Sequence, residues 1–443
     1  MVVANSSLCK QISNTNFNAY KQDFCVDFST YKQEICENSS NQHPVDASAY
    51  KKHSYREFSK IHQMSAYLAM FPPNLPHYFI DKISKENDLV FDPFSGRGTT
   101  AFEACRMGRV GVGNDLNPLA ICLTKAKVNM PLKSFILRRL KTLKNAYNKA
   151  NVDISELCDD IKMLYDEQTT LPQLVFLKQN LNKKRKIDNF ILGILTGLMH
   201  GKHRKDGTSI YCSIDMPNTF SMSPNYVRNF IKTHKLTKPR QDVFALIEQR
   251  LNVILEKSSS EFKSLKHYKK GHCFDKDAIE STQNIIEKYG KNSISLIITS
   301  PPYLKNIHYG KYNWIRLWLL DEDTKKVDKN VSIYHKMQKI RGIKDNLNFE
   351  NYAKYMQALF NSWHSILEPK ARAFVVIGDV EQNINLAQKT WDFIEQNGGC
   401  KLRLEQIIDD EIESNGARKV TRIWGKKRGK ATKFDRILML QKE

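Results

Sequence analysis

Two kinds of hydrophobic pattern alternate near the beginning of this 443-residue chain. Short apolar runs at 88–92 and 110–114 predict buried strands, and the stretches that follow them, 99–107 and 118–128, predict helices. A glycine turn joins the first strand to its helix, and a proline opens the second helix. This alternation of strand and helix is typical of a parallel, doubly wound sheet.

The same rhythm returns after residue 270. Five further runs predict strands, at 272–275, 294–299, 373–379, 402–408 and 434–440. Helices are expected between them, at 278–289, 352–367 and 386–396. Together with the first two strands, these runs predict an α/β fold built on a mostly parallel seven-stranded sheet.

The pattern divides the chain into four segments. Residues 1–54 are rich in Asn, Ser and Gln and predict a weakly ordered N-terminal arm. Residues 55–130 hold the first part of the α/β domain, after apolar positions at helical spacing from Phe58 to Leu68. Residues 131–270 read mainly as helices with long polar connections, so a mostly helical inserted domain is expected there. Residues 271–443 complete the α/β domain.

The charge balance narrows the choice of partner. Lys and Arg number 69 against 47 Asp and Glu, a net charge of +22, which favours a polyanion such as nucleic acid. The nine cysteines form no CxxC pair and no cluster with zinc-ligand spacing, so free thiols in a reducing compartment and no metal site are expected. No signal peptide and no membrane-length apolar run is visible, which favours a cytoplasmic location.

The first candidate site follows the first predicted strand. It consists of Asp92, Pro93, Phe94, Ser95, Gly96, Arg97, Gly98, Thr99 and Thr100. Two glycines let the backbone approach a ligand closely, and ligands of open α/β sheets bind outside the carboxyl ends of the strands. The spacing is neither GxGxxG nor a phosphate loop, so the ligand need not carry a phosphate. The alternative is an ordinary tight turn.

Asp115 stands at the end of the second predicted strand. A carboxylate in this position can accept both ribose hydroxyls of an adenosine moiety. The alternative is a helix-capping acid ahead of Asn117 and Pro118.

The second candidate site, Thr299-Ser300-Pro301-Pro302-Tyr303, ends an apolar strand. Two prolines remove backbone donors and leave carbonyl acceptors. Such acceptors suit an exocyclic amine, whose lone pair localises on nitrogen when its N–H groups are bound. Ser300 and the Pro301 carbonyl are the natural acceptors, and Tyr303 offers a ring on which an extruded base can stack. The alternative is a plain Pro-Pro turn.

These two motifs resemble those of the S-adenosylmethionine-dependent DNA amino-methyltransferases, the N4-cytosine and N6-adenine enzymes. Residues 92–100 look like the family's FxGxG cofactor motif, and residues 300–303 look like its catalytic [DNS]PP[YFW] motif. The resemblance covers roughly 60–130 and 270–443 and implies a Rossmann-like methyltransferase fold with S-adenosylmethionine as cofactor. The serine form is similar to that of the N4-cytosine enzymes, whereas Asp or Asn is more usual in N6-adenine enzymes.

The resemblance extends to further positions. It implies that Asp115 binds ribose and that Asp277 contacts the cofactor's adenine, with Asp275 as a competitor. It also implies that Phe71–Leu75 covers the methionine end. The insertion departs from the family pattern, because it precedes Asp277, whereas target recognition is expected between that acid and Ser300 or after it.

Basic positions are the candidates for contacts with DNA. We expect the insertion to read the target sequence, and further contacts to come from the segment after the catalytic motif and from the last hairpin loop. The expected DNA-binding residues are Lys183, Lys184, Arg185, Arg204, Arg240, Lys305, Arg418, Lys426, Lys427 and Arg428.

The function predicted from the sequence is methyl transfer to the N4 of cytosine in double-stranded DNA, by direct in-line displacement and without a covalent intermediate. The resemblance implies the modification enzyme of a restriction-modification system, with a cognate endonuclease acting separately. Three alternatives remain: an N6-adenine DNA enzyme, an RNA amino-methyltransferase and a non-catalytic DNA-binding subunit. C5-cytosine methylation is set aside, because no cysteine here follows a proline.

Overall fold

The computed structural model describes residues 48, 50–51, 53–68, 71–217, 220–302, 308–331, 349–378, 385–411 and 434–443. Seven strands form one sheet: β1 (Leu89–Asp92), β2 (Val110–Asn114), β3 (His272–Phe274), β4 (Ile294–Thr299), β5 (Leu367–Gly378), β6 (Leu402–Glu411) and β7 (Phe434–Lys442). Their order is β3-β2-β1-β4-β5-β7-β6; β7 runs antiparallel to β5 and β6, and all other neighbouring strands are parallel. The predicted seven-stranded, mostly parallel α/β fold is confirmed.

The strand order has a switch point between β1 and β4. From β1 the chain winds outward through β2 to β3, and from β4 it winds in the other direction through β5. The connections that follow β1 and β4 therefore diverge, which leaves a crevice outside the carboxyl ends of these two strands.

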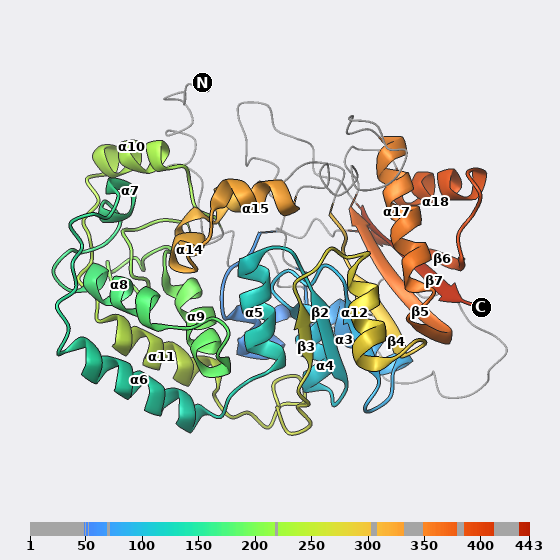
Figure 1. The fold of residues 1–443 in the computed structure, drawn as a ribbon, viewed down its shortest axis with the longest axis horizontal. Coiled ribbons are helices and arrows are strands. Elements are labelled where there is room, and N and C mark those ends of the chain that lie inside the picture. The colour runs from blue at the N-terminus through green and yellow to red at the C-terminus, as the bar shows by residue number, and fades with distance from the viewer. Residues whose placement is uncertain are drawn as a thin grey trace.

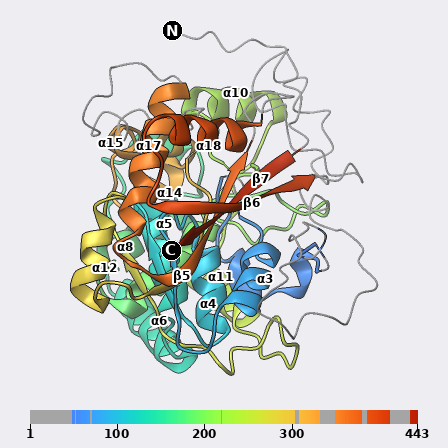
Figure 2. The ribbon, with the colours of Figure 1, turned by 90° about the vertical axis from the view of Figure 1, so that its right-hand side faces the viewer.

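Both faces of the sheet are buried, which explains why its central strands are almost continuously apolar. Val90 packs on one face against α3 (Asn74–Ile83) and α4 (Thr99–Arg106). Its neighbour Phe91 points to the other face, among α12 (Ser281–Tyr289), α17 (Phe349–Trp363) and α18 (Leu386–Gln396). In Figure 1, α12 and α17 lie in front of the sheet; in Figure 2, turned by 90°, they lie to the left and α3 lies to the right.

A helical region occupies the left of Figure 1, between β2 and β3 in the chain. It follows α5 (Pro118–Val128) and contains α6 (Lys133–Tyr147), α7 (Asp159–Lys162), α8 (Thr170–Asn180), α9 (Lys186–Leu198), α10 (Pro224–His234) and α11 (Val243–Ile254). Helix α9 packs on α5: a Cβ at Gly193 would lie 3.2 Å from Ala126 Cβ, so the two helices approach closely. The boundaries of a separate inserted domain, and its role, stay predictions.

Three shorter helices follow the catalytic motif: α13 (Tyr309–Tyr312), α14 (Trp314–Leu319) and α15 (Thr324–Val331). In Figure 1, α15 lies toward the top, on the side where the central strands end, and α14 lies beside it to the left. No helix within the described ranges is long and apolar enough to cross a lipid bilayer.

The helix predicted from Phe58 to Leu68 is wrong. This segment forms two 3-10 turns, η2 (Tyr55–Glu57) and η3 (Lys60–Gln63), because tertiary contacts hold its side chains. Ile61 and Met64 are buried against the helical region. His62 Nε2 lies 2.6 Å from the buried carboxylate of Glu103 on α4, which also pairs with Arg106.

Candidate active site

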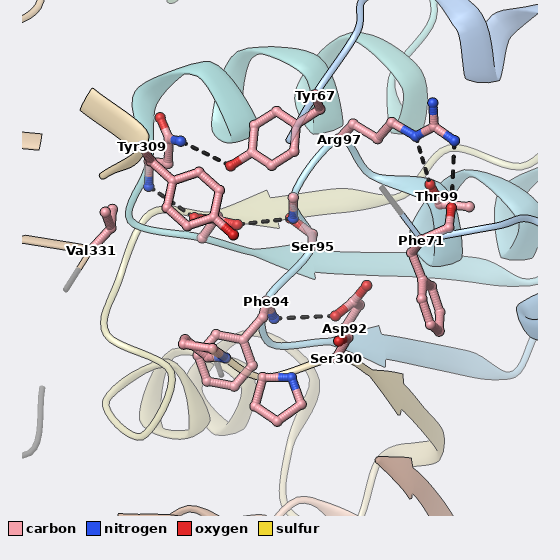
Figure 3. A pocket seen from close by; sticks show the side chains of 15 residues that line it. Tyr67, Phe71, Asp92, Phe94, Ser95, Arg97, Thr99, Ser300, Tyr309 and Val331 are labelled. Carbon is pink, nitrogen blue, oxygen red and sulfur yellow. Dashed lines mark hydrogen bonds between the residues drawn. The ribbon is translucent and has the colours of Figure 1, made fainter. Parts of the chain in front are cut away.

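An open cleft lies outside the carboxyl ends of β1, β2 and β4, at the switch point of the sheet (Figure 3). Its lining residues come from five separate stretches of the chain: Tyr67, Phe71, Asp92, Phe94, Ser95, Gly96, Arg97, Thr99, Asp115, Asn117, Ser300, Pro301, Pro302, Tyr309 and Val331. The glycine loop and the Ser-Pro-Pro motif therefore share one cleft. The predicted methyl transfer requires this arrangement, because the cofactor and the acceptor base must meet although the two motifs lie far apart in the sequence.

The glycine loop adopts a backbone that only glycine takes easily. Gly96 and Gly98 have φ values of +49° and +76°. A Cβ at Gly98 would also lie 2.8 Å from Thr124 Oγ1 and 2.9 Å from its Cα, so the loop sits directly on α5. This contact turns the backbone of the loop toward the cleft.

Asp115 connects the loop to the next strand. Its Oδ2 accepts a hydrogen bond from Gly96 N at 2.9 Å, and its Oδ1 accepts one from Asn117 N at 2.9 Å. The cap of α5 is Asn117, whose side chain accepts from Leu119 N at 3.1 Å, so Asp115 is not the helix cap. Asp115 is partly exposed in the cleft, where its carboxylate is available to hydroxyl donors.

Asp92 joins the two motifs. Its buried Oδ1 accepts from Thr299 Oγ1 at 2.7 Å and from Phe94 N at 3.1 Å. Thr299 ends β4 and precedes Ser300, so this bond ties the end of β4 to the end of β1. Burial raises the pKa of Asp92 from 3.8 to about 7, although the two hydrogen bonds act in the opposite direction.

The raised pKa of Asp92 predicts a pH-dependent cost of folding. From about pH 4 to pH 7 the unfolded chain is ionised at this residue while the folded protein keeps the proton, so stability falls as the pH rises. Above about pH 7 the folded protein carries a buried charge. We expect Asp92→Asn to raise the Tm at pH 8 by about 3–6 °C, because the amide keeps an acceptor without the charge.

Thermal unfolding of Asp92→Asn at pH 8 and pH 4.5 tests this expectation. The gain in Tm should shrink at pH 4.5, where the unfolded aspartate begins to hold its proton. Asp81→Asn is the matched control, because Asp81 is exposed and its ion pair within the described residues is with its neighbour Lys82. An equal gain at both pH values would show that ionisation of Asp92 is not its cause.

Ser300 lies beside Asp92 in Figure 3. Its hydroxyl donates to the carbonyl of Val376 on the neighbouring strand β5 at 3.3 Å. Because this proton points to Val376, the lone pairs of the oxygen can accept a donor from the cleft. Pro301 and Pro302 add no N–H donors at this point. Tyr303 and Lys305 lie outside the described residues.

Sequence reasoning did not assign several side chains of the cleft to a site. Tyr67 stacks on Tyr309, with ring centroids 5.8 Å apart and planes inclined by 25°, and its hydroxyl accepts from Asn117 Nδ2 at 2.8 Å. Figure 3 shows the two rings side by side at one end of the cleft. Tyr67 had been predicted only as part of an apolar helix face. Phe71, from the segment expected to cover the site, also lines the cleft.

Arg97 belongs to the glycine loop, but its sequence position predicted no role for it. Its buried guanidinium donates to Tyr55 Oη at 3.1 Å, to Thr99 Oγ1 at 3.3 Å and to the carbonyl of Phe71 at 3.4 Å. Its own carbonyl accepts from the buried ammonium of Lys127 at 2.7 Å. Arg97 therefore holds the segment before β1 against the glycine loop. No single-sequence signal marks such a contact.

The two candidate acids after β3 differ in environment. Asp277 is buried; its Oδ1 accepts from Ile279 N at 3.0 Å, while its Oδ2 has no hydrogen-bond partner among the described residues. Asp275 is exposed and lies 3.8 Å from the ammonium of Lys125. Asp277 is therefore the acid whose surroundings favour an incoming N–H donor.

The described residues among the predicted DNA contacts do not line the cleft. Lys183 binds the carbonyl of Leu320 at 3.1 Å and the carboxylate of Glu322. Lys183 and Lys184 line a second, lysine-rich pocket beside the start of β3. Arg185 precedes α9, Arg204 donates to Thr208 within its own turn, and Arg240 donates to Thr169, which precedes α8. Arg418, Lys426, Lys427 and Arg428 lie outside the described residues, and all these roles stay predictions.

Known proteins similar to this chain agree with its geometry. A model of the N6/N4 methyltransferase family, described as "DNA methylase", matches residues 12–125. The type II methyltransferase M.MvaI of Kocuria varians is 23% identical over 341 residues, which cover 67% of this chain and 70% of that protein. The type II methyltransferase M.BsoBI of Geobacillus stearothermophilus is 23% identical over 362 residues, which cover 76% and 66%.

A third relative, the type II methyltransferase M.MjaII of Methanocaldococcus jannaschii, is 30% identical over 101 residues, or 23% of this chain and 18% of that protein. The first two alignments thus span about two thirds of each relative. With the sheet order, the glycine loop and the Ser-Pro-Pro motif in one cleft, these matches lead to one conclusion: the chain is similar to the S-adenosylmethionine-dependent DNA amino-methyltransferases.

Proposed function

We propose that this protein transfers a methyl group from S-adenosylmethionine to the N4 of cytosine at a specific sequence in double-stranded DNA. It acts as the modification enzyme of a restriction-modification system, beside a separate endonuclease. The observation that carries the proposal is the shared cleft, in which Ser300 and Pro301 face the same space as Gly96 and Asp115. The type II methyltransferases among its relatives support the assignment to a restriction-modification system.

The residues around the cleft fit the cofactor. Asp115 would accept the ribose hydroxyls. Asp277 is buried and does not itself line the cleft, but its Oδ2, which has no partner among the described residues, would accept the adenine amino group. Asp92 would bind the methionine ammonium, and Phe71 would cover that end of the molecule. When bound, S-adenosylmethionine supplies a methyl group on a sulfonium centre, which is electrophilic and needs no metal to activate it.

The protein's own contribution is to position and polarise the acceptor amine. An exocyclic amine is conjugated with its ring, so its lone pair is poorly available. Ser300 Oγ and the Pro301 carbonyl would accept its two N–H bonds and localise the lone pair on nitrogen. The donation from Ser300 to Val376 holds the serine oxygen as an acceptor. Its neutral side chain, rather than a carboxylate, is the feature that favours cytosine N4 over adenine N6.

Product analysis tests the proposal directly. The protein is incubated with unmethylated duplex DNA and cofactor carrying a labelled methyl group, and the digested nucleosides are separated by mass. The expected product is labelled N4-methylcytosine, with N6-methyladenine absent. Single-molecule sequencing of the same DNA then gives the sequence context of the modified base.

Each alternative gives a different product. Detection of labelled N6-methyladenine would identify adenine N6 as the acceptor and leave the rest of the proposal intact. Preferential labelling of tRNA over duplex DNA in a competition would show that RNA is the substrate. Cofactor binding measured by calorimetry, without any methyl transfer to either nucleic acid, would identify a non-catalytic subunit.

A further inference from the structure

Helix α15 (Thr324–Val331) forms part of the rim of the cleft. Its last residue, Val331, is buried and lines the cleft, and Val327 packs into the core one turn earlier. Figures 1 and 2 place α15 on the side of the molecule where the carboxyl ends of the central strands lie. A nucleic acid whose base entered the cleft would pass close to this helix.

The helix is clamped to the segment that follows the catalytic motif. The carboxylate of Asp328 accepts from Gly310 N at 2.7 Å and from Lys311 N at 3.0 Å. A Cβ at Gly310 would lie 2.0 Å from the carbonyl oxygen of Thr324, so only glycine allows α13 and α15 to approach so closely. The outer face of α15 is therefore presented in a fixed orientation beside the cleft.

That outer face is cationic. Lys325, Lys326 and Lys329 are exposed and make no ion pair within the described part of the chain; we name these three residues the α15 lysine face. Residues 325 and 329 stand one turn apart on the helix, and residue 326 stands beside them. Unpaired ammonium groups grouped on a rigid surface attract a polyanion.

The acids of the same segment are engaged elsewhere. Asp321 pairs with Lys178, and Glu322 pairs with Lys183, both on the helical region. Asp323 accepts from the backbone N–H of residue 326 at 2.6 Å, at the start of the helix, and Asp328 is held by the two amides described above. The acids of the segment are thus engaged by lysines of the helical region or by backbone amides, while the three lysines are exposed to solvent.

We propose that the α15 lysine face binds backbone phosphates of duplex DNA next to the base held in the cleft. The inference rests on the proposed function, since it takes DNA as the substrate. Phosphate contacts of this kind set the position of the duplex and do not read its sequence. Their signature is counterion release, which makes affinity fall with salt by a slope of about 0.9 per neutralised phosphate.

The test compares the full-length protein with the triple variant Lys325→Gln, Lys326→Gln, Lys329→Gln. Affinity for a duplex is measured by fluorescence anisotropy from 50 to 200 mM salt. Three lost contacts should reduce the slope of log K against log salt by about 2.7. The variant should bind more weakly at 50 mM salt, and its loss of affinity across this range should be about 40-fold smaller than that of the wild type.

A control variant separates local contacts from overall charge. Lys133→Gln, Lys141→Gln, Lys149→Gln removes the same three charges from exposed positions on and just after α6. Helix α6 lies at the opposite side of the molecule from α15 in both Figure 1 and Figure 2. The control should keep the wild-type slope, and both variants should keep the wild-type affinity for S-adenosylmethionine, which reports an intact cleft.

The outcomes distinguish the inference from the function on which it rests. If the wild type binds DNA and the α15 variant keeps its slope, the α15 lysine face is not a phosphate site, while the proposed function stands. Equal changes in both variants would assign the effect to net charge and overturn the inference. A wild type that binds cofactor but no duplex DNA would overturn both.

Discussion

Replacing Ser300 by alanine is expected to lower kcat for methyl transfer to DNA by about 10²–10³-fold. The side chain supplies one of two acceptors for the amine, and removing one preorganised polar group from a catalytic site typically has an effect of this size. Affinity for S-adenosylmethionine should change by less than about threefold, because the cofactor is expected to contact the loop after β1 and the acids after β2 and β3. Single-turnover transfer of labelled methyl groups measures the first quantity, and calorimetry measures the second.

Ser295→Ala is the matched control for this variant. It removes a serine from β4, the strand that Ser300 follows, at a position where the hydroxyl donates to Glu368 at 3.1 Å and does not line the cleft. Its kcat should stay near that of the wild type. If Ser300→Ala also kept its kcat, the proposed amine contact would be wrong. If it lost cofactor affinity to the same extent, Ser300 would act by supporting the cleft.

The second large effect is expected at Asp115, where alanine should raise the Kd for S-adenosylmethionine by about 10²–10⁴-fold. Hydrogen bonds to a charged acceptor contribute roughly 1.5–3 kcal/mol each, and the ribose would lose two of them. The variant also removes the acceptor of Gly96 N, so the glycine loop loses its anchor to the next strand. Isothermal titration with the cofactor measures the change directly.

Asp275→Ala serves as the control for Asp115→Ala. This acid also follows a strand of the sheet, but it is exposed and faces Lys125 at 3.8 Å. It should leave the Kd unchanged, whereas Asp277→Ala should raise it. A larger effect at Asp275 than at Asp277 would reverse the assignment of the adenine contact, and an unchanged Kd for Asp115→Ala would exclude its ribose contact.

The elements of the sheet were predictable where an apolar run ends at turn residues. The strands at 110–114 and 294–299 are confirmed, because both faces of the sheet are buried. The helix at 386–396 is confirmed as well, because its buried residues recur at helical spacing. Strand β5 begins at Leu367, six residues before the predicted start. Its first residues are polar, and its pairing with β4 shifts register between Ile294 and Leu296, so no period of two marks them.

The candidate site was predictable only in part, for the same physical reason. Residues at strand ends, such as Asp92 and Ser300, occupy positions that the topology of a parallel sheet brings together. Tyr67 and Tyr309 reach the cleft from segments whose course depends on packing with the helical region, and their spacing in the chain carries no sign of the stacked pair. A single sequence reveals regular repeats of apolar residues, and the residues that make this contact follow no such repeat.

The hydrogen bond between Thr299 and Asp92 joins residues 207 positions apart. During synthesis on a ribosome, the glycine loop emerges long before its partner, so the nascent chain carries half a site while the helices between β2 and β3 are being made. Only the insertion of β4 beside β1 brings the halves together, and such long-range closure is slow. Methylating capacity therefore appears late, after the central strand of the sheet has docked.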